Sequence, residues 1–100
     1  MSNQIGIVAI LDFKEGGLEK ALPAIKACVK GSQQEEGNVF YTAHRESAHP
    51  ERIIFVERWK NQHAIDQHGK TTHFQNLVGA VTPLLSKPMV LHFLDEIEVE

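Results

Sequence analysis

Aliphatic runs and amphipathic stretches alternate along the chain, and their spacing predicts its strands and helices. Residues 4–13 are dense in Ile, Val and Leu and are bounded by polar residues, which predicts a buried strand. Apolar residues then recur at helical spacing from Leu18 to Val29, which predicts an amphipathic helix that ends at about Glu35. Pro23 lies inside this helix, where it removes a hydrogen bond, so we expect an irregular or kinked first turn.

Two strands joined by a short loop follow this helix. Residues 38–45 and 52–59 are rich in β-branched and aromatic side chains, and Pro50 marks the loop between them. This pattern predicts an antiparallel hairpin. Near the end of the chain, residues 89–99 predict a last strand.

A helical segment with a break in the middle separates the hairpin from the last strand. Asn61 can cap a short helix that runs to His68, and Gly69 is suited to its end. Thr72 and Gln75 have the spacing of a capping box at the start of a second, longer helix, which two prolines end. The order β-α-β-β-α-β predicts an α+β protein with an antiparallel sheet in a ferredoxin-like, split βαβ arrangement.

The predicted strands are apolar on both faces. In an antiparallel sheet that is covered on one side only, every second residue is expected to be apolar. Two helices can cover only one face, so we expect the other to be covered by a second copy of the chain in a two-fold homodimer. The two-sided pattern consists of Ile5, Ile7, Ala9 and Leu11 against Val8 and Ile10, Ile53 and Phe55 against Ile54 and Val56, and Leu91 and Phe93 against Val90 and Leu94.

Length and charge narrow the class of protein. A chain of 100 residues has the usual size of one domain, so we expect a single domain over residues 1–100. Ten basic and 13 acidic residues give a net charge of −3 with no basic stripe, which argues against nucleic-acid binding. Cys28 is the one cysteine and fits a reducing compartment. With no long apolar run and no signal-peptide pattern, we expect a soluble cytoplasmic protein that binds no membrane.

Six histidines are the most conspicuous candidates for chemistry, and two of them flank the break between the helices. His63, His68 and His73 are spaced by five residues, which is wrong for a metal pair on one helix, although the break could let two of them converge. An imidazole titrates near neutral pH, so His68 or His73 in a cleft could take a proton from a phenol or a carbon acid. The alternative is that both are solvated residues at helix ends.

Glu57 and Trp59 are the other unusual residues of the hairpin. Both are in phase with the apolar residues of their strand. A carboxylate among apolar side chains needs a partner or keeps its proton, so Glu57 could orient a histidine or form a salt bridge with Arg45 on the neighbouring strand. Trp59 could belong to the core or to a dimer contact, or it could hold a planar substrate beside a cavity.

The segment from Glu35 to Leu77 resembles the antibiotic biosynthesis monooxygenase family. The resemblance rests on Gly37 before the hairpin, the E-x-W of Glu57 and Trp59, the A-x-x-x-H of Ala64 and His68, and the T-x-H-F of Thr71, His73 and Phe74. It extends more weakly over nearly the whole chain. It implies a ferredoxin-like protomer that pairs face to face as a dimeric α+β barrel, with an apolar pocket between the sheet and the helices.

The same resemblance implies an activity. In the family's oxygenases a base removes a proton from a quinol-type aromatic substrate, and the resulting anion itself reacts with O2, so neither metal nor flavin is needed. We therefore expect an oxidoreductase of the monooxygenase type without a cofactor. The implied catalytic residues are His68, His73 and Glu57, and the implied substrate-binding residues are Trp59, Phe74 and Tyr41.

Other branches of the family give alternatives. Haem-degrading members use an Asn in strand one, a Trp in the short helix and a haem-binding His. Aliphatic residues, His68 and Val78 occupy those positions here, so haem is not expected. A second branch isomerises a phosphorylated quorum-sensing autoinducer, whose phosphate would need Arg45, Arg58 or Lys70. A third alternative is a non-catalytic dimer that binds a small molecule in the same pocket.

Overall fold

A computed structural model describes residues 3–99, and its element order confirms the predicted ferredoxin-like α+β arrangement with a broken second helix. The sheet has the order β2-β3-β1-β4, and neighbouring strands are antiparallel throughout. The elements are β1 (Ile5–Asp12), α1 (Gly17–Gln33), β2 (Asn38–Arg45), β3 (Arg52–Trp59), α2 (Gln62–Gly69), α3 (Thr72–Val81), the 3-10 turn η1 (Thr82–Leu84) and β4 (Val90–Leu94).

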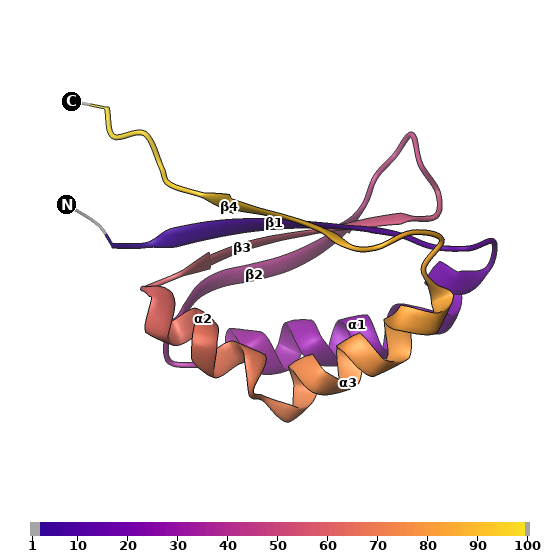
Figure 1. Ribbon diagram of the computed structural model, residues 1–100, viewed down its shortest axis with the longest axis horizontal. Coiled ribbons are helices and arrows are strands. Elements are labelled where there is room, and N and C mark those ends of the chain that lie inside the picture. Colours follow the sequence, from indigo (N-terminus) through magenta and orange to yellow (C-terminus); the bar gives the residue numbers. More distant parts are fainter. Residues whose placement is uncertain (1–2, 100) are drawn as a thin grey trace.

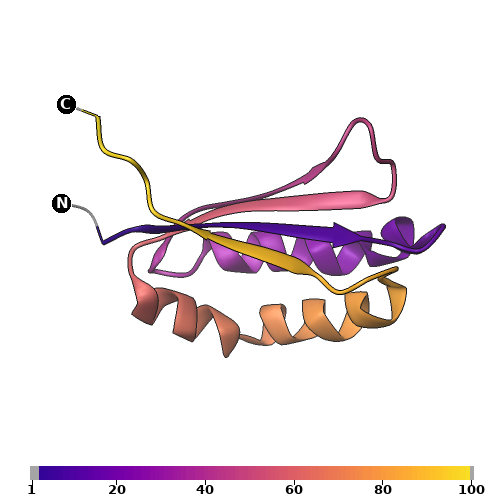
Figure 2. The same ribbon diagram turned by 45° about the horizontal axis from the view of Figure 1, so that its top comes forward.

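All three α-helices lie on one face of the sheet, and no helix or strand of residues 3–99 covers the opposite face (Figure 1). Helices α2 and α3 follow one another in a line that runs beside α1 (Figure 2). The core lies between the sheet and this helical layer, because every second residue of the central strands is buried. Its strand residues are Ile7, Ala9, Leu11, Tyr41, Ile53, Phe55 and Trp59. The helices add Leu18, Ala21, Ile25, Cys28, Ala64, Leu77 and Val81, and Phe13 follows β1.

The first helix differs from the sequence-based expectation at two places. It continues without interruption through Pro23, so the expected irregular turn is absent. The loss of one amide is tolerated there because the residues on either side, Ala21 and Ile25, are buried in the core. The helix ends at Gln33 instead of near Glu35, where the Glu35 amide closes a tight last turn by donating to the Ser32 carbonyl at 3.1 Å.

Two later boundaries also differ. The N-cap of α3 is Thr71 and not Thr72, since the Thr71 hydroxyl accepts from the Phe74 amide. The last strand ends at Leu94 and does not extend to Val99. Leu94 lies opposite Gly6, near the start of β1, so residues 95–99 have no neighbouring strand to pair with. The acidic residues of this segment favour solvent over burial.

The face of the sheet that the helices leave open is rich in apolar side chains. Val8 of β1 lies between Val56 of β3 and His92 of β4, and Ile10 lies between Ile54 and Val90 in the next row. These side chains are half-buried or exposed, and those of β4 are exposed throughout. The pattern confirms that the strands are apolar on both sides. Among the described residues, no helix is long and apolar enough to cross a bilayer.

Candidate functional site

The end of β3 turns a carboxylate and an indole toward the helices. Trp59 Nε1 donates a 2.8 Å hydrogen bond to Glu57 Oε1, and both side chains are buried. Of the two alternatives for Glu57, the salt bridge with Arg45 is not formed, because Arg45 forms a 2.9 Å ion pair with Glu19. The strand register is the reason, because it places Tyr41, and not Arg45, opposite Glu57. Trp59 is therefore the hydrogen-bond partner that stabilises this buried carboxyl group.

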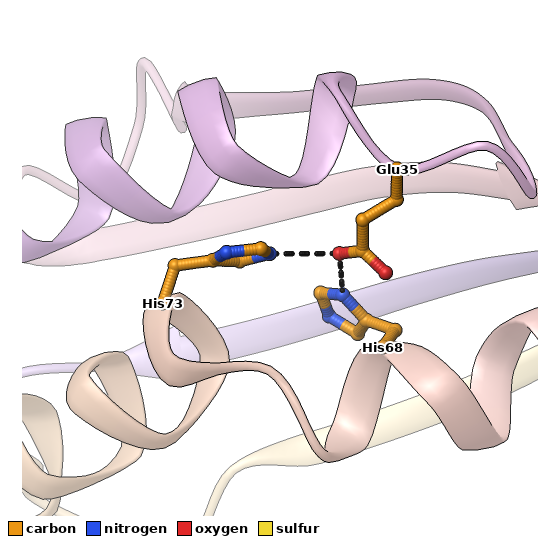
Figure 3. A group of neighbouring side chains, drawn as sticks. All are labelled: Glu35, His68 and His73. Atoms are coloured by element: carbon orange, nitrogen blue, oxygen red, sulfur yellow. Dashed lines mark hydrogen bonds and ion pairs between the residues drawn. The ribbon is translucent and has the colours of Figure 1, made fainter.

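Two histidines meet on one carboxylate at the break between α2 and α3 (Figure 3). His68 Nδ1 and His73 Nε2 each lie 2.7 Å from Oε2 of Glu35. Since an ionised carboxylate can only accept, both ring nitrogens that face it must carry a hydrogen. His68 is buried, whereas the side chain of His73 is 23% exposed. The helix break thus brings the two histidines together despite their spacing of five residues.

Helix caps hold the two histidines in place. The Asn61 side chain caps α2 by accepting a 2.9 Å hydrogen bond from the Ala64 amide, and His68 lies in the last turn of this helix. The Thr71 hydroxyl accepts from the Phe74 amide and also donates to the His68 carbonyl at 2.7 Å. One threonine therefore ties the end of α2 to the beginning of α3.

A glycine of α1 leaves room for the His73 ring. A Cβ atom at Gly31 would lie 2.5 Å from His73 Nδ1, so the imidazole packs directly on the helix backbone. Glycine inside a helix costs about 1 kcal/mol relative to alanine. The contact with His73 explains why a glycine occupies this position inside the helix.

The variant Gly31→Ala is expected to displace His73 and weaken its hydrogen bond to Glu35. Gly79→Ala in α3 is the matched control, because nothing lies within 4 Å of a Cβ there. The control should be more stable by up to about 1 kcal/mol, whereas Gly31→Ala should gain nothing or lose stability. Urea denaturation measures both, and the imidazole NMR signals report on His73. Equal stabilisation of the two variants would contradict the packing described here.

Aromatic rings surround His68. Its ring centroid lies 4.5 Å from that of Trp59, 4.8 Å from that of Phe74 and 5.5 Å from that of Tyr41. Tyr41 and Trp59 also contact each other edge to face at 6.1 Å. The predicted site residues therefore form one cluster around His68, with Glu57 joined to it through Trp59 and His73 through Glu35.

Burial changes the proton affinities of this cluster. Desolvation raises the pKa of Glu57 to about 7, although the Trp59 hydrogen bond opposes the rise. Desolvation lowers the pKa of His68, and the Glu35 carboxylate works in the opposite direction. The pKa of Tyr41 is raised, mainly by burial, so its phenol stays protonated. Near neutral pH, Glu57 consequently exists in both protonated and ionised forms.

A small apolar cavity lies between the sheet and α3. Its volume is about 50 Å³, and Glu57, Tyr41 and Phe74 are among its lining residues. His68, His73 and Trp59 do not line it, so the six predicted site residues converge as a cluster without sharing one cavity. The remaining lining residues are Ala9, Leu11, Phe55, Leu77, Val78, Val81, Met89 and Leu91.

Glu35 is the site residue that the sequence analysis did not identify. It follows the end of α1, and its carbonyl accepts from the Asn38 amide at 3.0 Å, which fixes the turn into β2. One signal in the sequence could have indicated it. Glu35 and Glu36 lie at the C-terminal end of a helix, where negative charge is unfavourable unless a cation or donor compensates it.

The same three residues could also hold a metal ion. The donor atoms of Glu35, His68 and His73 all lie within 4.8 Å of one another. Two imidazole nitrogens and a carboxylate oxygen are a ligand set found in zinc and non-haem iron proteins. The arrangement is thus chemically able either to exchange protons or to coordinate a divalent cation.

Comparison with known proteins identifies relatives of the chain. A family model described as antibiotic biosynthesis monooxygenase matches residues 4–80. "Putative monooxygenase YcnE" of Bacillus subtilis (strain 168) is 31% identical over 85 residues, which are 85% of this chain and 90% of YcnE.

Solved structures share the fold. PA3566 from Pseudomonas aeruginosa aligns with a TM-score of 0.90 at 22% identity and covers 98% of each chain. A crystal structure of an antibiotic biosynthesis monooxygenase aligns with a TM-score of 0.90 at 22% identity, over 94% of this chain and 99% of the other. From the family model and the relationship to YcnE, the chain belongs to the antibiotic biosynthesis monooxygenase family.

Proposed function

We propose that the protein is a cofactor-independent monooxygenase that acts on a small quinol-type aromatic compound, with residues 1–100 forming one domain. The observation that carries the proposal is the pairing of His68 with the Glu35 carboxylate inside an aromatic cluster. A histidine oriented by a carboxylate is a common general base. The unpaired thiol of Cys28 fits a place in the reducing cytoplasm.

His68 is the proposed base through its Nε2 atom. Its Nδ1 hydrogen is committed to Glu35, so Nε2 of the neutral ring carries a lone pair. The hydrogen bond of His68 to Glu35 uses Nδ1, and no described residue forms a hydrogen bond with Nε2. Among the described residues, every side-chain nitrogen or oxygen that is fully buried does have a hydrogen-bond partner. Nε2 is therefore not fully buried. Since His68 does not line the cavity beside Glu57, substrate entry must also open a path to this atom before it can accept a phenolic proton. His73 supports this state by adding a second hydrogen bond to Glu35.

The oxygen step needs no external electron donor. Deprotonation makes the quinol an anion that can pass one electron to O2, and the two radicals combine at a ring carbon to give a peroxide. The O–O bond then breaks: one oxygen stays on the ring carbon, the other leaves as water, and the ring is oxidised to a hydroxyquinone. The quinol supplies all the electrons, so one quinol and one O2 give one hydroxyquinone and one water.

Glu57 is the proposed proton donor to the departing oxygen. Its carboxyl group borders the apolar cavity, and its pKa of about 7 keeps part of it protonated at neutral pH. The cavity of about 50 Å³ is much smaller than a typical ligand site of roughly 300–1,000 Å³. Substrate entry therefore requires rearrangement, for which the flexible Met89 side chain in the cavity wall is suited.

The proposed role of Glu57 predicts a pH dependence. The rate constant kcat should fall as the pH rises through about 7, because the protonated carboxyl group that donates the proton is then lost. Steady-state oxygen uptake over a range of pH measures this. In the variant Glu57→Gln, the decrease of kcat at alkaline pH should disappear. A decrease that persists in this variant would show that another group causes it.

The chain is less suited to a phosphorylated substrate. Arg45 is paired with Glu19, and Arg58 is paired with Glu96 at 2.8 Å. Neither of these arginines nor Lys70 lines the cavity beside Glu57. This favours an unphosphorylated aromatic substrate over the isomerase alternative.

Labelled oxygen tests the proposed activity. The protein is mixed with a dihydroxynaphthalene under isotopically labelled O2, and the consumed O2, the product mass and any hydrogen peroxide are measured against heat-denatured protein. We expect one O2 per product and one labelled oxygen in the hydroxyquinone. Formation of peroxide with unlabelled quinone would indicate an oxidase, and absence of uptake across a panel of quinols would favour isomerase or binding activity.

We further propose that two copies pair through the open face of the sheet. Val56 lies in the middle of that face between Thr42 and Val8. Val56→Glu should weaken the dimer at least about 100-fold, because an unpaired carboxylate would be buried in it. Lys20→Gln on the exposed side of α1 changes the net charge by the same amount and should leave the dimer intact. Sedimentation measures the association, and a wild-type protein that stays monomeric would contradict the proposal.

A further inference from the structure

We propose that Glu35, His68 and His73 form a binding site for a divalent transition-metal ion of the zinc type, and that the ion blocks the base function of His68. Two imidazoles and a carboxylate from separate parts of the chain converge on one point between α1, α2 and α3 (Figure 3). Three protein ligands leave a fourth position for water, as in zinc sites that are not closed by four protein side chains. Nothing in the proposed oxygen chemistry requires this ion.

The donor atoms are close to the geometry that zinc needs. The two nitrogens lie 2.7 Å from Oε2 of Glu35. In a tetrahedral site with bonds of about 2.0–2.1 Å, neighbouring donor atoms are about 3.3 Å apart. Replacing the two hydrogen bonds by metal bonds lengthens each N–O separation by roughly half an ångström. The two nitrogens, which lie within 4.8 Å of one another, must also come to about 3.3 Å, and side-chain rotation at the partly exposed His73 can supply these shifts.

The surroundings of the three ligands also fit an ion. The Glu35 carboxylate supplies the negative charge, and no described Lys or Arg forms an ion pair with it. A surface pocket of about 410 Å³ borders Glu35, so this ligand lies at the edge of a solvent-accessible hollow. On the other side, the absence of a side chain at Gly31 leaves the space that the His73 ring occupies. Imidazole and carboxylate together suit Zn²⁺ or Co²⁺ better than Mg²⁺ or Ca²⁺.

Metal binding would change the state of His68 at its second nitrogen. Coordination through Nδ1 requires that atom to lose its hydrogen, so the neutral ring then carries its hydrogen on Nε2. Nε2 becomes a donor and cannot accept a phenolic proton. The inhibition rests on the proposed function, but the binding of the ion does not.

Binding of Zn²⁺ and Co²⁺ to the metal-free full-length protein tests the inference. We expect one ion per chain by calorimetry, a rise in Tm with Zn²⁺, and the intense visible absorption of four-coordinate Co²⁺. Both His73→Ala and Glu35→Gln should weaken Zn²⁺ binding at least about 100-fold. His49→Ala, in the exposed loop before β3, is the histidine control and should bind like the wild type.

Circular dichroism first establishes that the variants are folded, and Glu35→Gln keeps the side-chain size if His73→Ala does not fold. Absence of saturable Zn²⁺ binding would overturn the inference, as would binding that both variants retain. Activity separates the two proposals. If Zn²⁺ stops oxygen uptake and a chelator restores it, both the oxygenase activity and the inhibitory metal site are supported. Uptake without Zn²⁺ binding supports the oxygenase alone. Zn²⁺ binding without any uptake supports the metal site alone.

Discussion

The variant His68→Ala is expected to lower kcat with a quinol substrate by about 10²–10⁴-fold, the usual contribution of a general base. The side chain is buried among Trp59, Phe74 and Tyr41, and its Nδ1 bonds to Glu35. Its removal takes away the proposed proton acceptor and leaves Glu35 with His73 as its remaining imidazole partner. Oxygen uptake at saturating quinol measures the effect.

Two further variants show whether the loss arises from the base. His49→Ala removes an exposed histidine whose partner is Glu46, so its kcat should equal that of the wild type. Glu35→Gln keeps the shape of the side chain but removes the charge that orients His68, so its kcat should fall to a value between those of the wild type and His68→Ala. Rates for His68→Ala within about threefold of the wild type would remove His68 from the mechanism.

Trp59→Ala is expected to destabilise the protein by about 3–5 kcal/mol, the range for truncation of a buried aromatic side chain. Trp59 is fully buried, and its ring contacts Tyr41 and His68. Its loss would also leave the buried Glu57 carboxyl without its only hydrogen-bond partner among the described side chains. Urea denaturation measures the change, which should appear as a lower midpoint.

Trp59→Phe separates the indole hydrogen bond from the packing. Phenylalanine keeps most of the buried apolar surface but has no N–H group. Because the Trp59 hydrogen bond lowers the pKa of Glu57, its loss should raise this pKa above about 7 and extend the protonated state to more alkaline pH. NMR of a labelled Glu57 carboxyl group measures the pKa. An unchanged pKa would show that the hydrogen bond does not stabilise the ionised form.

The fold was predictable because hydrophobic periodicity and capping residues agree along most of the chain. The alternation in β1 and β3 and the Asn61 cap of α2 both follow local rules that a sequence displays directly. The end of β4 was not predictable in this way. It depends on where β1 begins, because Leu94 lies opposite Gly6, and such pairing across the sheet is not visible in the strand's own sequence.

The site was predictable only in part for the same reason. His68, His73, Glu57 and Trp59 stand out in sequence because they are polar or aromatic residues at unusual positions in amphipathic elements. Their partners depend on tertiary geometry. Glu35 is more than 30 residues from His68 in the chain and reaches it because α1 packs beside α3, which follows α2.

The small size of the cavity has a kinetic consequence. A volume of about 50 Å³ accommodates one or two water molecules at roughly 30 Å³ each, so a quinol cannot enter before Met89 and its neighbours move apart. If opening precedes association, the observed rate of binding should level off at high quinol concentration, at the rate constant for opening. The protein would then select substrates by how often it opens as well as by how tightly it holds them.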